Sequence, residues 1–136
     1  MTTIADTGFA VALGNRRDPY HLDVKGVYAK QKQILLPQTV LAEVAYLLSR
    51  DAGIARLVQF LEALPTSRFQ PICLTEHDFA RSAEILKQYG DSRIDFVDAS
   101  VMAVAERCGL DTILTLDRRD FSIYQPSHCA AFILLP

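Results

Sequence analysis

Short apolar runs alternate with longer amphipathic segments along the whole chain. The short runs are flanked by turn residues and predict buried strands at residues 2–5, 34–36, 69–74, 112–116 and 130–135. Apolar residues at helical spacing predict helices at residues 9–13, 19–28, 39–48, 54–64, 75–90 and 92–108. Crossovers between successive strands imply parallel pairing. The pattern therefore predicts an α/β fold with three α/β/α layers around a mostly parallel central sheet.

Length and composition indicate one folded domain. The chain has 136 residues, and we expect a single domain over residues 1–136. Half of the residues (50%) are hydrophobic, which excludes a disordered chain. The sequence has neither an apolar stretch of the roughly 18 residues that a membrane span needs nor a signal-peptide pattern at its start. We therefore expect a cytoplasmic protein without a membrane partner.

The net charge and the cysteine content exclude several classes of protein and of site. The net charge of −2 excludes a protein that coats nucleic acid through a basic surface. Recognition of a nucleic acid would have to depend on a few arginines and on bound cations. The cysteines Cys73, Cys108 and Cys129 are odd in number and lack a C-x-x-C spacing. We expect reduced thiols in or near the core, with neither a disulfide framework nor a zinc site.

Asp98 is a carboxylate on the apolar side of a predicted helix. At 100° per residue it lies within about 60° of Ile94, Val101 and Met102, so its side chain faces the protein. Burial of an unpaired carboxylate costs several kcal/mol, so a cation, a metal ion or strong hydrogen-bond donors must lie nearby. None of its helical neighbours is a lysine or an arginine.

Three further acids are placed to reach the same region. Glu43 lies at the border of the apolar face of its helix, and Asp6 and Asp117 each follow a short strand. The carboxyl ends of parallel strands meet at one edge of a sheet. Two carboxylates about 5 Å apart repel by about 3 kcal/mol at an effective dielectric of about 20, so the four need a cation. Oxygen ligands without convergent histidines or cysteines favour Mg²⁺ or Mn²⁺, which suits phosphodiester hydrolysis.

Each of these acids taken alone also has an ordinary structural interpretation. Asp6 is a favoured helix N-cap, Glu43 is an acid near the start of a helix, and Asp117 is a turn residue. A phosphoacceptor receiver domain is an alternative α/β fold with acids at strand ends. It predicts an acidic pair after the first strand and a lysine at a late strand end, and neither is present.

Two more acids could belong to the same site. Asp95 is either a fifth ligand or the partner of Ser92 in a helix capping box. Asp120 is either an accessory acid or an ordinary loop charge, and we favour the loop charge. Basic pairs also lie near the acids, and their side chains could contact RNA phosphates or remain solvated in loops: Arg16, Arg17, Arg118 and Arg119.

Four segments, in this order, resemble the PIN-domain nucleases and particularly the VapC-type toxins of toxin-antitoxin pairs. They span nearly the whole chain: Ile4-Ala5-Asp6-Thr7, Leu41-Ala42-Glu43-Val44, Asp95-Phe96-Val97-Asp98-Ala99 and Thr115-Leu116-Asp117-Arg118-Arg119-Asp120-Phe121. The resemblance implies that Asp6, Glu43 and Asp98 are the principal catalytic metal ligands and that Asp117 fills a fourth position.

The resemblance also carries expectations about other residues and about partners. Thr7 and Thr115 match hydroxyl positions near the site, whereas Gly8 departs from the serine or asparagine that is common there. The family implies an endoribonuclease that leaves 5′-phosphate and 3′-hydroxyl ends, a homodimer and a cognate antitoxin that blocks the site. The alternative is a PIN-like scaffold that binds RNA or protein without nuclease activity.

Overall fold

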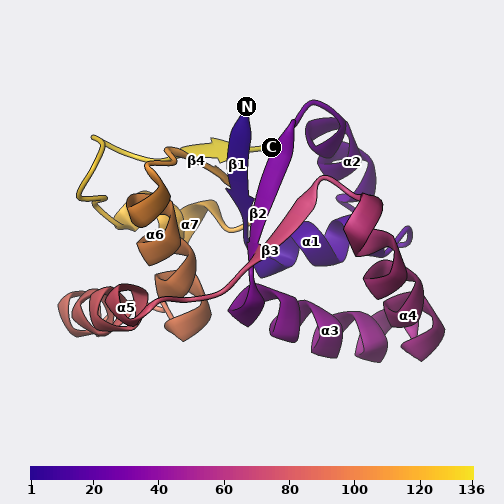
Figure 1. Ribbon diagram of the computed structural model, residues 1–136, viewed down its shortest axis with the longest axis horizontal. Coiled ribbons are helices and arrows are strands. Elements are labelled where there is room, and N and C mark those ends of the chain that lie inside the picture. The colour runs from indigo at the N-terminus through magenta and orange to yellow at the C-terminus, as the bar shows by residue number, and fades with distance from the viewer.

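Five parallel strands form the central sheet in the computed structural model, which describes residues 1–136 (Figure 1). Their order across the sheet is β3-β2-β1-β4-β5, and every neighbouring pair is parallel. The strands are β1 (Thr2–Ala5), β2 (Gln33–Pro37), β3 (Phe69–Ile72), β4 (Thr112–Leu114) and β5 (Ile133–Leu135). The predicted α/β class is confirmed, with a sheet that is parallel throughout.

The helices follow the predicted order with two differences. They are α1 (Thr7–Gly14), α2 (His21–Ala29), α3 (Gln38–Ala52), α4 (Ile54–Ala63), α5 (Glu76–Gln88), α6 (Phe96–Cys108) and α7 (Arg118–Ile123), with the 3₁₀ helix η1 (Leu64–Thr66) after α4. Helix α6 begins at Phe96 and not near Ser92, because Asp95 is its N-cap. Helix α7 was not predicted, because its six residues are too few to show an apolar stripe.

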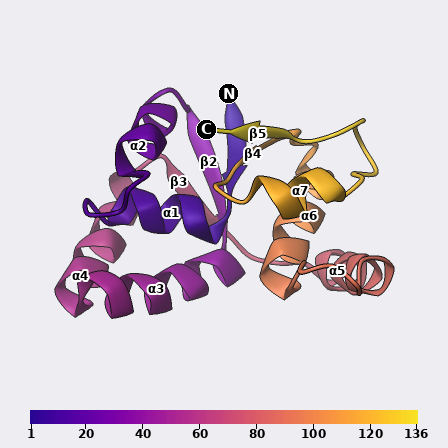
Figure 2. The ribbon, with the colours of Figure 1, turned by 180° about the vertical axis from the view of Figure 1, so that it is seen from behind.

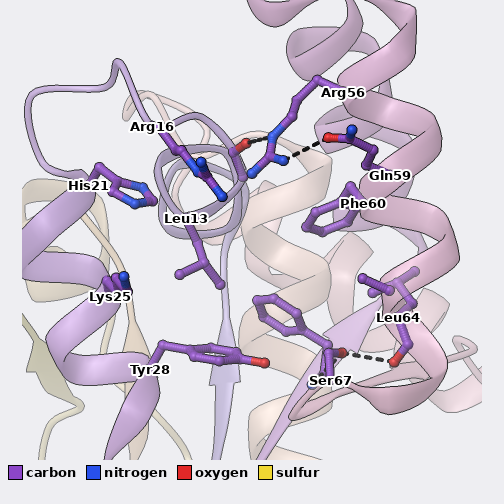
Figure 3. A pocket seen from close by; sticks show the side chains of 13 residues that line it. Leu13, Arg16, His21, Lys25, Tyr28, Arg56, Gln59, Phe60, Leu64 and Ser67 are labelled. Atoms are coloured by element: carbon purple, nitrogen blue, oxygen red, sulfur yellow. Dashed lines mark hydrogen bonds between the residues drawn. The ribbon is translucent and has the colours of Figure 1, made fainter.

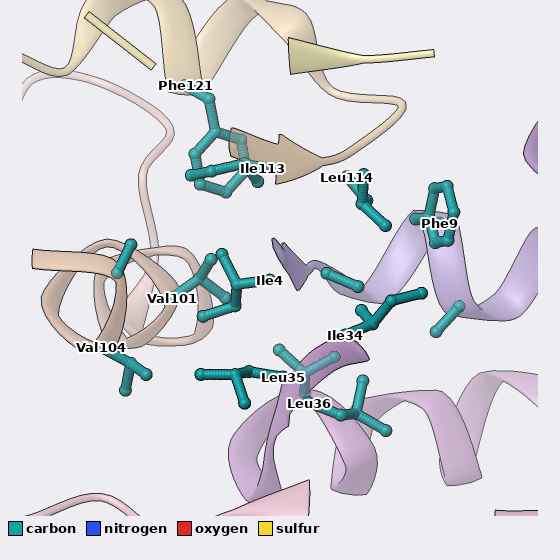
Figure 4. Close-up of a cluster of buried hydrophobic side chains, with 14 of the residues drawn as sticks. Ile4, Phe9, Ile34, Leu35, Leu36, Val101, Val104, Ile113, Leu114 and Phe121 are labelled. Carbon is teal, nitrogen blue, oxygen red and sulfur yellow. The ribbon is translucent and has the colours of Figure 1, made fainter. Parts of the chain in front are cut away.

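Helices cover both faces of the sheet. In Figure 4, Val101 and Val104 of α6 lie on one side of the strand residues, and Phe9 of α1 lies on the other. Figure 2 shows α1 in front of the strands, whereas in Figure 1 it lies behind them. Side chains of all three layers are fully buried, among them Ile4, Phe9 and Val101. This packing confirms the three-layer arrangement.

The order of the strands in the sheet changes direction between β1 and β4. The chain adds β2 and then β3 on one side of β1, and it adds β4 and β5 on the other. Ile4 pairs with Ile113 and Ala5 with Leu114, so β1 and β4 end at the same level. Ligand sites of open α/β sheets lie beyond the carboxyl ends of the strands at such a reversal. The residues that follow Ala5 and Leu114 therefore occupy the expected position of a site.

The three thiols are free, as predicted from their number and spacing. Cys108 and Cys129 are partly buried, but Cys73 is exposed, which corrects the expectation that all three lie in or near the core. Cys73 follows the edge strand β3, which leaves it without cover from a neighbouring strand. No helix combines the length and the apolar character that a membrane span requires.

A buried carboxylate joins α5 to α6. The side chain of Asp78 has 0% of its surface exposed, and Arg107 of α6 lies 2.9 Å from it. The backbone N–H of Thr75 also donates to Asp78 at 2.9 Å and completes a capping box. Burial alone would raise the pKa of Asp78, but the hydrogen bonds from Arg107 and Thr75 outweigh it and lower that pKa below its ordinary value.

We predict that Arg107→Gln lowers the free energy of unfolding by about 2 kcal/mol at neutral pH, because the Asp78 charge loses its partner. A lowered pKa means that this stabilisation is present above the unfolded-state pKa of 3.8 and is lost as the pH falls through the folded-state value. Urea unfolding at neutral and acidic pH measures the difference. Arg50→Gln, which breaks the exposed pair with Asp51, is the control and should cost less than about 1 kcal/mol. Equal losses in the two variants would contradict the assignment.

Candidate active site

An open hollow of about 580 Å³ lies beyond the carboxyl ends of β1 and β4. We call it the acid pocket. Six carboxylates line it, together with Thr7, Gly8, Arg93 and Leu116. The six are Asp6, Glu43, Asp95, Asp98, Asp117 and Asp120. The four principal acids inferred from sequence are thus brought to one place, although they are far apart in the chain.

Asp6 and Asp117 are held by one hydroxyl group. The Asp6 N–H donates to Leu114 O at 3.1 Å, which continues the pairing of β1 with β4. Its carboxylate accepts the Phe9 N–H at 3.0 Å and a short hydrogen bond from the Thr115 hydroxyl. Thr115 in turn accepts the Asp117 N–H at 2.8 Å. The buried Thr115 therefore sets the position of both acids that follow the two strands.

Asp98 lies in the first turn of α6 and forms a capping box with Asp95. The Asp98 N–H donates to the Asp95 carboxylate at 2.9 Å, and the Asp95 N–H donates to Asp98 Oδ2 at 3.2 Å. Of the two alternatives for Asp95, the capping box with Ser92 is therefore wrong, because the helix begins at Phe96, four residues later than predicted. Asp98 is half-buried and has one oxygen without a hydrogen bond, so capping accounts for only part of its placement.

Asp117 and Asp120 belong to the short helix α7. Asp117 is its N-cap and accepts the Asp120 N–H at 3.2 Å. Asp120 is only 5% exposed, and its Oδ1 has no hydrogen-bond partner. The interpretation of Asp120 as an ordinary loop charge is therefore wrong, because Asp120 belongs to α7 and its buried side chain lines the acid pocket.

Glu43 reaches the acid pocket from the second turn of α3. It is half-buried, and Thr39 lies one turn before it. The Thr39 hydroxyl lies 2.7 Å from the Ser100 hydroxyl of α6. This contact aligns the N-terminal turns of α3 and α6, and thus the helices that carry Glu43 and Asp98.

The pKa values reflect carboxylates held in a partly desolvated space. The pKa of Asp6 is raised to about 6, because burial and, to a smaller extent, the charges of Asp117 and Glu43 outweigh the hydrogen bonds from Thr115 and Phe9. Burial raises the pKa of Asp98 to about 8. The folded chain thus holds these acids at a cost that a nearby cation would relieve.

The donor set of the acid pocket fits a hard divalent cation. All of its candidate ligands are oxygen atoms, and the buried hydroxyl of Thr7 has no hydrogen-bond partner, like Asp120 Oδ1. As the side chains stand, no three acidic, histidine or cysteine residues form an arranged metal-binding group. Binding therefore requires the carboxylates to rotate toward one another, a change that their mutual repulsion disfavours without the cation.

Arg16 and Arg17 do not line the acid pocket. Arg16 lines a hollow of about 310 Å³ between α1, α2 and α4, beside Leu13 and Phe60 (Figure 3). Both arginines line an adjoining hollow near Arg56. The structure therefore corrects the expectation that this pair lies beside the acids, because α1 carries it away from the strand ends.

The second arginine pair divides between two places. Arg118 donates to Leu134 O at 3.5 Å and to Pro136 O, so it is directed toward the end of β5. Arg119 lines a hollow next to the acid pocket. Arg93, which sequence reasoning missed, is the one cation that lines the acid pocket itself. Its local sequence does not distinguish it from a solvated arginine, since Arg118 and Arg119 lie as near to an acid in the sequence and do not line the acid pocket.

Gly8 lies in the first turn of α1, at a position where the family that the sequence resembles commonly has a serine or an asparagine. A Cβ atom there would lie 3.9 Å from Asp6 Oδ1 and 4.0 Å from Leu116 Cβ, which are ordinary contacts. We predict that Gly8→Ser folds normally and gains about 0.5 kcal/mol, since glycine disfavours the helix. Urea unfolding of the two proteins measures the difference. A Gly8→Ser protein less stable than the unsubstituted chain would contradict this prediction.

Comparisons with known proteins agree with this geometry. Residues 3–125 match the family model described as PIN domain. The chain is 28% identical to Ribonuclease VapC26 of Mycobacterium tuberculosis over 134 residues, which are 98% of this chain and 99% of that protein. The crystal structure of Mycobacterium tuberculosis VapC20, a sarcin-ricin loop cleaving toxin, superposes with a TM-score of 0.78 at 27% identity over 86% of this chain and 91% of that one. The structure of VapBC2 from Rickettsia felis, bound to a promoter DNA fragment, gives 0.70 at 20% identity over 98% and 97%.

The protein is therefore one of the α/β domains that gather acids at the carboxyl edge of a parallel sheet. Because the family model covers most of the chain, the chain belongs to the PIN domain family.

Proposed function

We propose that this chain is a Mg²⁺-dependent endoribonuclease that hydrolyses RNA phosphodiester bonds in the acid pocket, with Mn²⁺ able to replace Mg²⁺. The observation that carries the proposal is the convergence of six carboxylates on one hollow. Burial raises the pKa values of Asp6 and Asp98, which supports a site that needs a cation. The ribonuclease name of VapC26 supports RNA as the substrate.

The chain's own residues would have distinct roles. Asp6, Glu43, Asp98 and Asp117 would hold the ion, which when bound lowers the pKa of a coordinated water and neutralises charge on a phosphate group. Thr115 keeps Asp6 and Asp117 in place through its hydroxyl. Asp95, Asp120 and Thr7 line the same space as accessory groups. We expect products with 5′-phosphate and 3′-hydroxyl ends, because water attacks in place of the RNA 2′-hydroxyl.

Cleavage of a panel of structured RNAs tests this proposal. The panel includes a sarcin-ricin loop hairpin, because VapC20 is described as cleaving that loop. We expect cleavage with Mg²⁺ or Mn²⁺, its loss with EDTA and its loss in Asp6→Asn. Mass spectrometry identifies the product ends. Cleavage that persists in EDTA would contradict the proposal.

The second candidate is a PIN-like scaffold that binds RNA or protein without cleaving it. It is favoured by the absence of an arranged metal-binding group in the acid pocket. Calorimetric titration with Mn²⁺ separates the two candidates. A nuclease should bind Mn²⁺ in a manner that depends on Asp98, whereas a scaffold should show no such binding.

We also propose that the chain is the toxin of a toxin-antitoxin pair, blocked by a cognate antitoxin. VapC20 is described as a toxin, and this supports the proposal. Induced expression should arrest bacterial growth, and Asp98→Asn should abolish the arrest. Coexpression of the cognate antitoxin, to be sought in the neighbouring open reading frame, should also relieve it. Growth arrest by Asp98→Asn equal to that of the unsubstituted chain would contradict a toxic nuclease.

A homodimer is part of the same proposal. Helix α4 exposes Ile54, Val58 and Leu61, whose spacing of four and three residues places them on one face. Such an apolar stripe is available to a second copy of the chain. Light scattering should give twice the chain mass of 15.2 kDa. A monomer at micromolar concentration would contradict this part of the proposal.

A further inference from the structure

Arg93 is the single cation among the residues that line the acid pocket, against six carboxylates. Despite these neighbours, it forms none of the ion pairs of the chain. Burial and the neighbouring Asp117 raise the pKa of Asp120, and the charge of Arg93 acts against this rise, so the guanidinium lies within electrostatic reach of Asp120. An exposed, unpaired guanidinium beside a phosphodiester-binding site is available to a phosphate group.

A second hollow of about 370 Å³ adjoins the acid pocket, and we call it the side hollow. Arg93 and Asp120 line both hollows, so the two are neighbours with a shared wall. The side hollow adds Arg119, Tyr89 and the half-exposed Ile123. Its volume lies within the roughly 300–1,000 Å³ of small-ligand sites.

Local contacts fix the groups of the side hollow before any ligand arrives. The Tyr89 ring packs on Tyr124 at a centroid distance of 5.4 Å, and its hydroxyl accepts the Gln125 N–H at 3.0 Å. Ser92 closes a turn onto Tyr89 O through its N–H at 2.9 Å and its hydroxyl at 2.7 Å. Ile94 is buried directly after Arg93. Both ends of the segment that carries Arg93 are therefore anchored.

The charges of the two hollows differ, and the difference favours an RNA strand that runs from the acid pocket into the side hollow. The acid pocket opposes six carboxylates with Arg93 alone. In the side hollow, Arg93 and Arg119 balance Asp91 and Asp120. A nucleic-acid strand that leaves the acid pocket therefore meets less repulsion over Arg93 than elsewhere along the acid wall. The basic hollow near Arg17 shares no lining residue with the acid pocket.

The geometry points to the side hollow as the binding site for the nucleotide next to the cleaved phosphodiester bond. Arg93 and Arg119 contact the phosphates on its two sides, and the base packs against Tyr89 and Ile123. Bases of single-stranded or looped RNA stack on aromatic side chains in this manner, while arginines hold the backbone. This inference rests on the proposed nuclease function, because it assigns a place for the RNA next to the scissile bond.

RNA binding by Arg93→Gln and Arg119→Gln tests the inference. The probe is a fluorescein-labelled sarcin-ricin loop hairpin, and all variants carry Asp98→Asn so that the probe stays intact. We expect each substitution to raise the Kd about fivefold or more and to reduce the salt dependence of binding by roughly one phosphate contact. Arg17→Gln removes the same charge from the separate hollow and should change the Kd less than about twofold.

Two further readouts separate this inference from the proposed function. In the cleaving protein, Arg93→Gln should raise KM about fivefold with little change in kcat, because Arg93 contacts a phosphate of the neighbouring nucleotide and not the scissile one. RNA carrying 4-thiouridine should crosslink to the segment that contains Tyr89. If Arg93→Gln and Arg119→Gln changed neither cleavage nor RNA binding, the proposed role of the side hollow would be overturned, whereas the proposed nuclease function would stand. RNA binding that depends on both arginines, with no cleavage by the unsubstituted chain or any variant, would keep the side hollow only as an RNA-binding site and would overturn the proposed nuclease function.

Discussion

Asp98→Asn should reduce metal-dependent RNA cleavage on the order of 100-fold or more while the protein remains folded. The amide oxygen of Asn can still accept the Asp95 N–H, so the capping box of α6 is kept. What disappears is one negative charge of the candidate ion site. Cleavage assays across Mg²⁺ and Mn²⁺ concentrations measure the loss. Glu62→Gln removes an exposed acid of α4 outside the acid pocket, and it should cleave as the unsubstituted chain does.

When no metal is present, the same substitution, which lowers cleavage, should raise the thermal stability of the protein. Burial raises the pKa of Asp98 to about 8, above the ordinary value of 3.8. A raised pKa means that the unsubstituted chain loses stability as the pH rises from about 4 to about 8, because the charged form is disfavoured in the fold. In EDTA at pH near 8, Asp98→Asn should therefore melt at a higher temperature. Mn²⁺ should raise the Tm of the unsubstituted chain only. Equal stabilisation of both proteins by Mn²⁺ would contradict Asp98 as a ligand.

Thr115→Val should raise the Mg²⁺ concentration needed for half-maximal cleavage about tenfold or more. Valine has nearly the shape of threonine but cannot donate to Asp6 or accept from the Asp117 N–H, so both acids lose their common support. Thr115 is only 1% exposed, and the unpaired buried groups should also cost about 2 kcal/mol of stability. Metal titration of the cleavage rate and urea unfolding measure the two effects.

Thr115→Ser is the matched control for this substitution. It keeps the hydroxyl and loses one methyl group, which should cost about 1 kcal/mol of stability with little change in the metal requirement. If Thr115→Val and Thr115→Ser required the same Mg²⁺ concentration, the hydroxyl would have no role in positioning the acids.

The sequence allowed the sheet and the strand-end acids to be predicted for a simple physical reason. Short apolar runs mark strands that are buried on both faces, and parallel strands bring their carboxyl ends to one edge. Asp6 and Asp117 follow two such runs, and β1 and β4 are in fact paired neighbours. Their common location therefore follows from topology without knowledge of side-chain packing.

Asp98 was predicted to face the protein for a reason that is only partly right. The inference placed it inside the apolar stripe of a helix that starts near Ser92. The helix begins at Phe96, so Asp98 lies in its first turn, where Asp95 caps the helix. Helix periodicity gave the side of the helix correctly, but it does not locate the N-cap among several candidate polar residues.

Arg93 and Asp120 could not be assigned from local patterns. Both depend on how the segment that holds Arg93 packs beside α7, and α7 is too short to leave a periodic signal. Asp120 is buried in the first turn of that helix, where Asp117 accepts its N–H. Such placements arise from contacts between segments that are distant in sequence, so they require the folded structure.

The most direct test of the central claim is anomalous diffraction from crystals of the protein soaked in Mn²⁺, recorded on both sides of the manganese absorption edge. If the carboxylates of the acid pocket bind the ion, we expect an anomalous peak between Asp6 and Asp98, close enough for Glu43 and Asp117 to coordinate it. Well-ordered carboxylates without a peak between them, or a peak elsewhere on the molecule alone, would contradict a metal-dependent site in this pocket.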